Sequence, residues 1–188
     1  MGRWPTGSAQ RLKASALELF AERGYSHVTG AEIARRAGMS ERTFFRHFRA
    51  KEDVLFEDYS GARDSLRAAI SAGHTPVSAA EVIDTVASFF HDRFETRRAE
   101  HVGMAAVVAG EPALVQRLVI YEQSWIAPIA EGLEARGMPA LRARLLAGAM
   151  ATAFRAAYDR WLADDAGPPL RTRFVDGMRM LGAVLADL

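Results

Sequence analysis

Residues 29–53 read TGAEIARRAGMSERTFFRHFRAKED and decide the fold of the N-terminal part of the chain. Thr29 and Glu32 have the spacing of a capping box, in which the threonine hydroxyl accepts from the third N–H of the helix while the glutamate reaches back to the cap. The helix that opens there stops at Gly38. Two residues later Ser40 can cap a second short helix, which we expect over residues 41–47.

A further helix precedes this stretch. Leu12, Ala16, Leu19 and Phe20 form one apolar stripe at helical spacing, and Gly24 follows at the position expected for the C′ residue that ends the helix. Three short helices separated by tight turns within 51 residues are typical of a helix-turn-helix unit.

Residues 40–47 have the chemistry of a helix that reads DNA. Such a helix is short, begins with small or polar side chains and presents donors to bases and phosphates. Arg42 can read guanine with its guanidinium fork, while Glu41 fits a cytosine reader as well as a solvated or cap-supporting residue. Thr29, at a helix N-terminus, suits a phosphate oxygen. The candidate DNA-binding residues are Thr29, Ser40, Arg42, Thr43, Phe45, Arg46, His47 and Lys51.

The charge is divided unevenly along the 188 residues. Residues 1–51 carry ten Lys or Arg and four Asp or Glu, a balance of +6, whereas residues 52–188 carry fourteen and nineteen, a balance of −5. The net charge of +1 is therefore a cancellation. A basic head on an acidic body indicates a polyanion-binding module joined to a second domain.

The rest of the chain also predicts helices. Apolar residues recur at three- and four-residue spacing and strand-like alternation is nearly absent, so the fold class is all-α. Ser78 and Glu81 have the spacing of a second capping box, and Pro128 is a candidate kink. The predicted helices run from Lys51 to about Ser71, from Ser78 to about Phe94, over residues 102–109, from Pro112 to about Arg136, over residues 140–163 and over residues 170–185. In the last of these, the helical spacing of apolar residues is clearest from Phe174 onward.

The stretches ALELFAERGYSHVT (residues 16–29) and EIARRAGMSERTFFRHFRAKEDVL (residues 32–55) resemble the DNA-binding domain of TetR-family transcriptional regulators. The landmarks LF, GY, T, IA, AG.S..T and HF..K occur in order over about a quarter of the chain. The resemblance implies that Thr29, His47 and Lys51 contact phosphates. It places Arg42, Thr43 and Arg46 in the recognition helix, against bases and nearby backbone.

Two positions depart from the family pattern. Phe45 stands where the family usually has tyrosine, so a phenolic hydrogen bond to phosphate is missing and apolar packing remains. Ala50 replaces the usual polar cap before the next helix, which should weaken that cap modestly.

The resemblance also implies the domain organisation: residues 1–51 bind DNA, and residues 52–188 form a larger helical bundle that binds an effector and dimerises. The last two helices occupy the position that the family uses for a four-helix dimer interface. The alternative is that their apolar stripes pack inside one subunit.

A largely apolar effector is expected to bind between the middle helices of the body. The candidate pocket residues are Phe89, Phe90, Phe94, Met104, Tyr121, Trp125, Met150 and Phe154, each of which also fits an ordinary core. Tyr121, Gln123 or His91 would supply polar contacts. The later helices loosely resemble TetR-like domains associated with acyl-CoA-like ligands. Arginines that would meet the phosphates of such a ligand are explained more simply as a solvated helix face.

Several classes of protein are excluded by composition and motif. Without cysteine there is no disulfide framework, zinc finger or thiol nucleophile. The motifs GxGxxG, GxxxxGK[ST], GxSxG and HExxH are absent, so we predict no enzyme and no cofactor. His91 and Glu95 are four residues apart, but no third ligand at a telling spacing supports a metal site. No charge-free stretch reaches the roughly twenty residues of a membrane helix, and the expected location is the cytoplasm.

The sequence therefore predicts a homodimeric TetR-type repressor that a small effector releases from a pseudo-palindromic, double-stranded operator. One alternative is a helical ligand-binding protein or enzyme whose basic head is incidental. Another, within DNA binding, is an activator or an effector-independent regulator.

Overall fold

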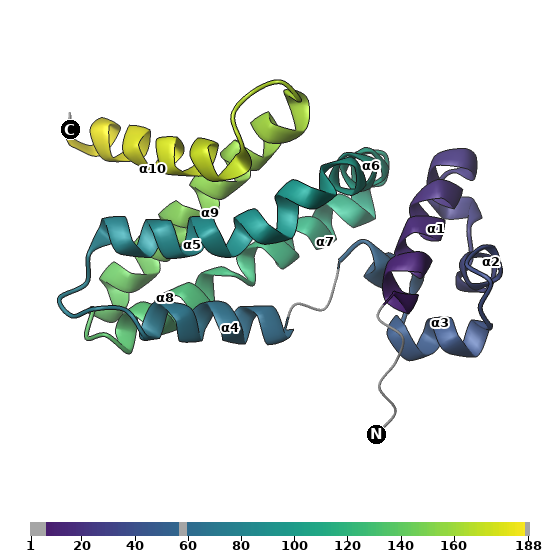
Figure 1. The fold of residues 1–188 in the computed structure, drawn as a ribbon, viewed down its shortest axis with the longest axis horizontal. Helices are drawn as coiled ribbons and strands as arrows, with labels where there is room; N and C mark the ends of the chain where they lie inside the picture. Colours follow the sequence, from purple (N-terminus) through teal and green to yellow (C-terminus); the bar gives the residue numbers. More distant parts are fainter. Residues whose placement is uncertain (1–6, 57–59, 187–188) are drawn as a thin grey trace. The chain divides into compact units, whose positions relative to one another are not determined.

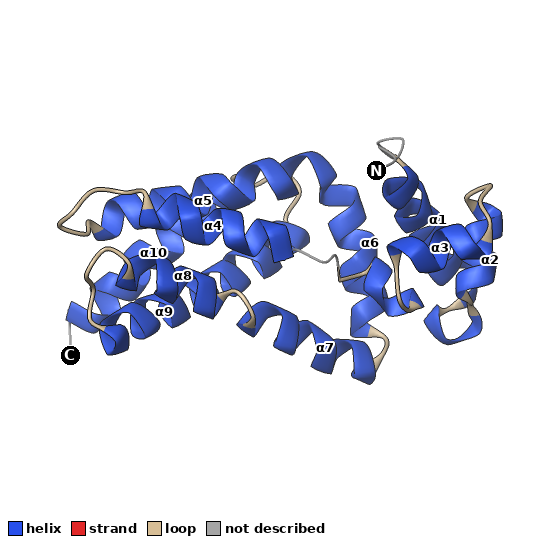
Figure 2. Cartoon of the chain, turned by 90° about the horizontal axis from the view of Figure 1, so that it is seen from below, coloured by secondary structure: helices blue, strands red, loops and turns tan. Residues whose placement is uncertain are grey.

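The computed structural model describes residues 7–56 and 60–186, and over these ranges it is helical without a single strand (Figures 1 and 2). The all-α prediction is confirmed. The α-helices are α1 (Ser8–Arg23), α2 (Gly30–Arg36), α3 (Glu41–His47), α4 (Ser60–Ser71), α5 (Ala79–Phe94), α6 (Arg98–Ala109), α7 (Pro112–Gln123), α8 (Ile126–Glu134), α9 (Ala140–Ala163) and α10 (Leu170–Ala186). Short 3-10 helices cover Tyr25–His27, Lys51–Val54 and Glu95–Arg97.

The chain divides into two compact units. The first comprises residues 1–58 and 99–118, and the second comprises residues 59–98 and 119–188. The boundary predicted after residue 51 rests on charge and sequence motif rather than on compactness, and it stays a prediction.

In the first unit, the turn between α2 and α3 has the hydrogen bonds of a Schellman motif. The N–H of Met39 donates to the Ala34 carbonyl at 2.8 Å, and the N–H of Gly38 donates to the Arg35 carbonyl at 3.1 Å. Gly38 has φ +67°, a left-handed conformation that glycine adopts without a steric penalty. The motif ends α2 sharply and lets α3 begin after Ser40.

Helices α2 and α3 approach each other closely at Gly30 and Phe44. Phe44 is fully buried, and a Cβ added to Gly30 would lie 2.8 Å from the Phe44 ring. No side chain larger than hydrogen fits at residue 30 without moving the ring. The core of α1–α3 is completed by Leu12, Ala16, Leu19, Phe20, Val28, Ile33 and Ala34.

The segment after α3 differs from the single long helix predicted from Lys51 to Ser71. A 3-10 helix covers Lys51–Val54, and α4 starts only at Ser60. Asp53, three residues after Ala50, compensates for the weak cap expected at Ala50. A carboxylate oxygen of Asp53 accepts from the N–H groups of Arg49 at 3.0 Å and Ala50 at 3.1 Å.

The second unit encloses an apolar core between α4, α5, α8, α9 and α10 (Figure 1). The buried residues of this core include Leu66, Ile70, Val82, Val86, Phe90, Trp125, Ile129, Leu133, Ala147, Met150, Trp161, Leu170 and Phe174. Among the described residues, no helix is both long enough and apolar enough to cross a membrane.

The single helix predicted from Pro112 to Arg136 is instead two. α7 ends at Gln123 and α8 begins at Ile126, so the break lies before the expected kink at Pro128. The Ser124 hydroxyl donates to the Tyr121 carbonyl at 2.6 Å and accepts from Arg63 at 3.1 Å. Pro128 falls in the first turn of α8, where the missing N–H costs nothing.

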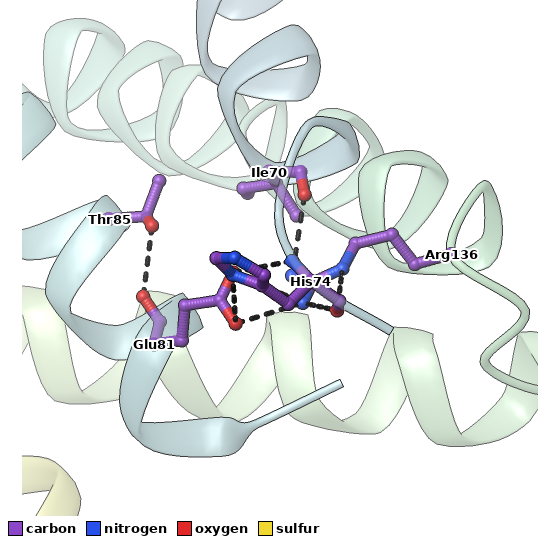
Figure 3. A network of polar contacts seen from close by, with 5 residues as sticks. All are labelled: Ile70, His74, Glu81, Thr85 and Arg136. Carbon is purple, nitrogen blue, oxygen red and sulfur yellow. Dashed lines mark hydrogen bonds and ion pairs between the residues drawn. The ribbon is translucent and has the colours of Figure 1, made fainter. Parts of the chain in front are cut away.

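The capping box predicted for Ser78 and Glu81 is not formed. Ser78 is the N-cap of α5 but its side chain makes no capping bond. The Glu81 carboxylate instead accepts from the His74 N–H at 3.1 Å and from Arg136, with both oxygens 3.1 Å from Nη2 (Figure 3). A long-range ion pair has replaced the local bond.

Arg136 is the centre of this network. Its side chain is only 2% exposed, and its guanidinium also donates to the carbonyls of His74, at 3.0 Å from Nε, and Ile70, at 3.4 Å (Figure 3). The end of α8 is thereby tied to the loop between α4 and α5. At Gly73 in this loop, an added Cβ would lie 2.1 Å from Glu81 and 2.6 Å from Arg136.

Candidate nucleic-acid interface

Helix α3 buries one side and exposes the other. Phe44 points into the core, while Glu41, Arg42, Phe45 and Arg46 are exposed, with Phe45 51% accessible. Residues four apart are neighbours on a helix surface, so Glu41 and Phe45 form one row and Arg42 and Arg46 form the next. We refer to these four residues as the α3 outer face. It combines two guanidinium groups, a carboxylate and an aromatic ring.

Ser40 and Thr43 are occupied at the start of α3. The Ser40 hydroxyl accepts from the Thr43 N–H at 3.2 Å, and the two hydroxyl oxygens lie 2.9 Å apart. Ser40 therefore caps the helix, and the Thr43 hydroxyl is hydrogen-bonded to the capping hydroxyl. Their predicted contact with DNA would add to this role, because a hydroxyl has two acceptor lone pairs.

Thr29 forms the predicted capping box with Glu32. Its hydroxyl accepts from the Glu32 N–H at 3.3 Å, and the Glu32 carboxylate accepts from the Thr29 hydroxyl and N–H, both at 2.9 Å. The hydrogen bond from the Thr29 side chain, followed by that from its backbone, lowers the pKa of Glu32 below its ordinary value. Thr29 remains exposed at the N-terminus of α2, where a phosphate contact is predicted.

Lys51 has a structural role that sequence reasoning missed. Its ammonium donates to the carbonyls of Tyr25 at 2.8 Å and Val28 at 3.0 Å, and it lies 4.1 Å from the centre of the Tyr25 ring. Burial, and then the neighbouring Glu52, raises the pKa of Tyr25 to about 12. Two of the three ammonium protons hold the loop before α2, which leaves the third for the predicted phosphate contact. The pairing joins residues more than twenty positions apart, so no local pattern signals it.

His47 lies in the last turn of α3, and Asp53 lies in the 3-10 helix that follows it. His47 is partly buried, with its ring centre 6.2 Å from that of Phe48. Asp53 forms an ion pair with Arg117 of α7 in addition to its capping bonds. Sequence reasoning missed Asp53 as a capping residue, although Asp53 follows Ala50 by three residues, the spacing that a capping box requires.

In the second unit, aromatic side chains of α5 and α9 form a continuous cluster with Trp125, which lies between α7 and α8. The Phe90 ring centre lies 4.5 Å from that of Phe154 and 5.2 Å from that of Trp125, and the Phe94 ring centre lies 5.6 Å from that of Phe154. Seven of the eight candidate pocket residues belong to this core or pack against it: Phe89, Phe90, Phe94, Tyr121, Trp125, Met150 and Phe154. Met104 lies on α6 in the first unit.

An open groove of about 380 Å³ lies between α5 and the start of α10, lined by Ser88, His91, Pro169, Arg171 and Thr172. It contains none of the aromatic pocket candidates. The Nδ1 atom of His91 is 3.9 Å from a carboxylate oxygen of Glu95, which accepts from the Leu170 N–H at 2.5 Å. Over residues 7–56 and 60–186, no group of three or more His, Asp or Glu is placed to hold a metal ion.

A three-helix unit with a tight turn before a short, guanidinium-bearing helix, followed by a helical bundle, defines a helix-turn-helix transcriptional regulator. Residues 12–57 match the family described as "Bacterial regulatory proteins, tetR family". Residues 12–57 therefore form a helix-turn-helix domain of the TetR type, the DNA-binding part of a class of transcriptional regulators that are not enzymes.

Known proteins resemble the chain in sequence over part of its length and in fold over nearly all of it. The HTH-type transcriptional regulator TcmR of Streptomyces glaucescens is 40% identical over 72 residues, which are 37% of this chain and about a third (32%) of TcmR. The fold of the chain is similar to that of Thermus thermophilus FadR, a TetR-family repressor in complex with lauroyl-CoA, with a TM-score of 0.57, 23% identity and 92% of each chain covered. It is also similar to SmeT of Stenotrophomonas maltophilia in complex with triclosan, with a TM-score of 0.63, 13% identity, and 95% and 91% covered.

Proposed function

We propose that the protein is a homodimeric repressor whose two α3 helices enter successive major grooves of a pseudo-palindromic operator. The α3 outer face is the observation that carries this proposal, because it presents Arg42 and Arg46 to solvent on a helix fixed by Phe44. A two-fold dimer would place the two helices one turn of DNA apart, about 34–36 Å. Residues 1–51 would form the DNA-binding domain, and the protein would act in the cytoplasm, with its DNA.

The dimer is proposed to form through α9 and α10. Leu141 and Leu145 on α9, and Met180, Val184 and Leu185 on α10, are all more than 60% exposed in the single chain. Large apolar side chains exposed together on two helices are typical of an interface. A second copy of the chain would cover them in a four-helix arrangement.

The effector is proposed to be a small, largely apolar molecule that enters the aromatic cluster of Phe90, Trp125 and Phe154. The ligands of two proteins of the same fold, lauroyl-CoA and triclosan, support an apolar group of this kind. To release DNA, the effector must bind the two conformations of the dimer unequally. A thermal-shift screen of acyl-CoAs, fatty acids and aromatic compounds tests the idea, because a ligand of the folded state raises its melting temperature.

A fluorescence anisotropy titration against the DNA that flanks the protein's own gene tests DNA binding itself. The repressor should bind one fragment in preference to the others, as a dimer, with an affinity that falls steeply as salt rises. Binding without sequence preference or salt dependence would instead favour the helical ligand-binding alternative. Transcription from the bound promoter, measured with and without the protein, distinguishes a repressor from an activator.

Arg42→Ala is expected to relax the preference for one or two base pairs of each half-site. A guanidinium bidentate to guanine contributes roughly 1–3 kcal/mol of discrimination, and Arg42 has no ion-pair or hydrogen-bond partner among the described residues that would hold it elsewhere. Affinities for operators with single base changes measure the effect. A uniform loss across all sequences would show that Arg42 contacts phosphate instead.

Lys51→Ala is expected to change both stability and DNA binding. Losing two charge-assisted hydrogen bonds to the Tyr25 and Val28 carbonyls should lower the free energy of unfolding by at least about 1.5–3 kcal/mol, the contribution of one such bond. Losing the predicted phosphate contact should weaken binding to all sequences and flatten the slope of log affinity against log salt by about one unit. Urea denaturation and a salt series measure the two effects separately. A changed base preference with an unchanged slope would contradict the assigned role.

A further inference from the structure

Glu41 is an acidic residue at the start of a surface otherwise suited to a polyanion. It lies beside Arg42 and one turn before Phe45 on the α3 outer face. Its carboxylate has no ion pair or hydrogen bond with any of the described residues, the adjacent arginines included. A carboxylate that faces DNA without a partner is repelled by the phosphates, so its presence on this face lowers affinity unless a base donates to it.

The caps of α3 leave Glu41 without a structural hydrogen bond. The N-cap is Ser40, whose hydroxyl accepts from the Thr43 N–H at 3.2 Å. In a capping box the glutamate would stand at the third helical position, which here is Thr43, so Glu41 cannot complete one. An acid in the first turn interacts favourably with the helix dipole, but this interaction produces no preference for any base.

We infer that Glu41 determines operator specificity by accepting a hydrogen bond from the N4 amino group of a cytosine in each half-site. The inference rests on the proposed function, in which α3 lies in the major groove. There cytosine presents an amino donor, whereas guanine N7 and O6 and thymine O4 are acceptors that repel a carboxylate. Adenine presents an amino donor beside the N7 acceptor, which would face the second carboxylate oxygen. Cytosine is therefore the base that matches Glu41.

The experiment is a selection of bound duplexes from a randomised library with the full-length wild-type chain and with Glu41→Gln. The wild type should select C·G at one position of each half-site, and changing that pair should weaken its binding about 5- to 150-fold. A glutamine amide both donates and accepts, which suits adenine N6 and N7. The Glu41→Gln variant should therefore move the preference at that position from C·G to A·T.

Glu134→Gln is the matched control, because Glu134 is exposed on α8, has no side-chain partner among the described residues, and loses the same charge. This variant should keep the wild-type preference. If Glu41→Gln also kept it, or only bound all sequences more tightly, Glu41 would be a solvated charge and the inference would be wrong. If the wild type selected no sequence at all, both the proposed function and the inference would be wrong. The outcome in which Glu41→Gln keeps the wild-type preference contradicts the inference alone.

Discussion

Replacing Phe44 with alanine is expected to lower the free energy of unfolding by about 3–5 kcal/mol, the usual cost of removing a fully buried phenylalanine. The ring fills the space between α2 and α3, where Gly30 approaches it most closely, and its centre lies 5.6 Å from that of Phe48. Without the ring, α3 loses its support against α2. Sequence-specific DNA binding should therefore be lost as well. Urea denaturation followed by circular dichroism measures the stability, and anisotropy measures the binding.

Phe45→Ala is the control for this prediction, because it removes the same side chain from the adjacent position. Phe45 is 51% exposed, and its ring is perpendicular to that of Phe44, with 5.3 Å between ring centres. Its loss should cost about 0.5 kcal/mol or less, as for most surface substitutions. Any effect on DNA binding would then come from the lost contact rather than from unfolding. Equal destabilisation by both variants would contradict the observed packing of Phe44.

Arg136→Ala is expected to destabilise the second unit by about 3–5 kcal/mol, the cost of breaking a buried ion pair by removing one partner. The variant leaves the carbonyls of His74 and Ile70 without their donor and the Glu81 carboxylate without its cation. The loop between α4 and α5 would lose its attachment to α8. Thermal unfolding and hydrogen exchange at residues 71–78 measure the global and local effects.

Arg142→Ala is the matched control, since Arg142 is an exposed arginine of α9 with no side-chain partner among the described residues. It should change stability by no more than about 0.5 kcal/mol. Arg136→Met tests whether Arg136→Ala loses stability because hydrogen bonds are missing or because side-chain volume is missing. Because methionine fills the volume but donates no hydrogen bond, it should remain strongly destabilising. If Arg136→Met restored stability, the guanidinium would matter only as a space-filling group.

The helices of the first unit could be predicted because their ends are encoded locally. Thr29 and Glu32 form the expected capping box, Gly38 ends α2, and Ser40 caps α3. Each signal operates within one helical turn, so it can be recognised without knowledge of the rest of the chain. The same property let the sequence place Arg42 and Arg46 on a short exposed helix.

What the sequence could not predict depends on contacts between distant residues. Glu81 has the spacing of a capping residue, but Arg136, 55 positions later, provides a charged donor that a backbone N–H cannot match. Lys51 likewise turns to carbonyls that precede it by 23 and 26 positions. For Glu81 a local rule named the right residue and the wrong partner, whereas for Lys51 no local pattern indicates the structural contacts that it makes. The aromatic candidates had a related ambiguity, since a stripe of Phe and Trp has the same spacing in a packed core as in a ligand site.

The contact of Gly30 with Phe44 has a consequence for protein engineering. Because the ring leaves no room for a Cβ at residue 30, any larger residue there would displace Phe44 and with it the helix that carries the candidate DNA-binding side chains. Residues 30 and 44 must then stay unchanged in any redesign, whereas Glu41 and Arg42, which are exposed and have no side-chain partner among the described residues, can be varied without disturbing the packing. Randomising these two positions should retarget the regulator to a new promoter while its stability is retained.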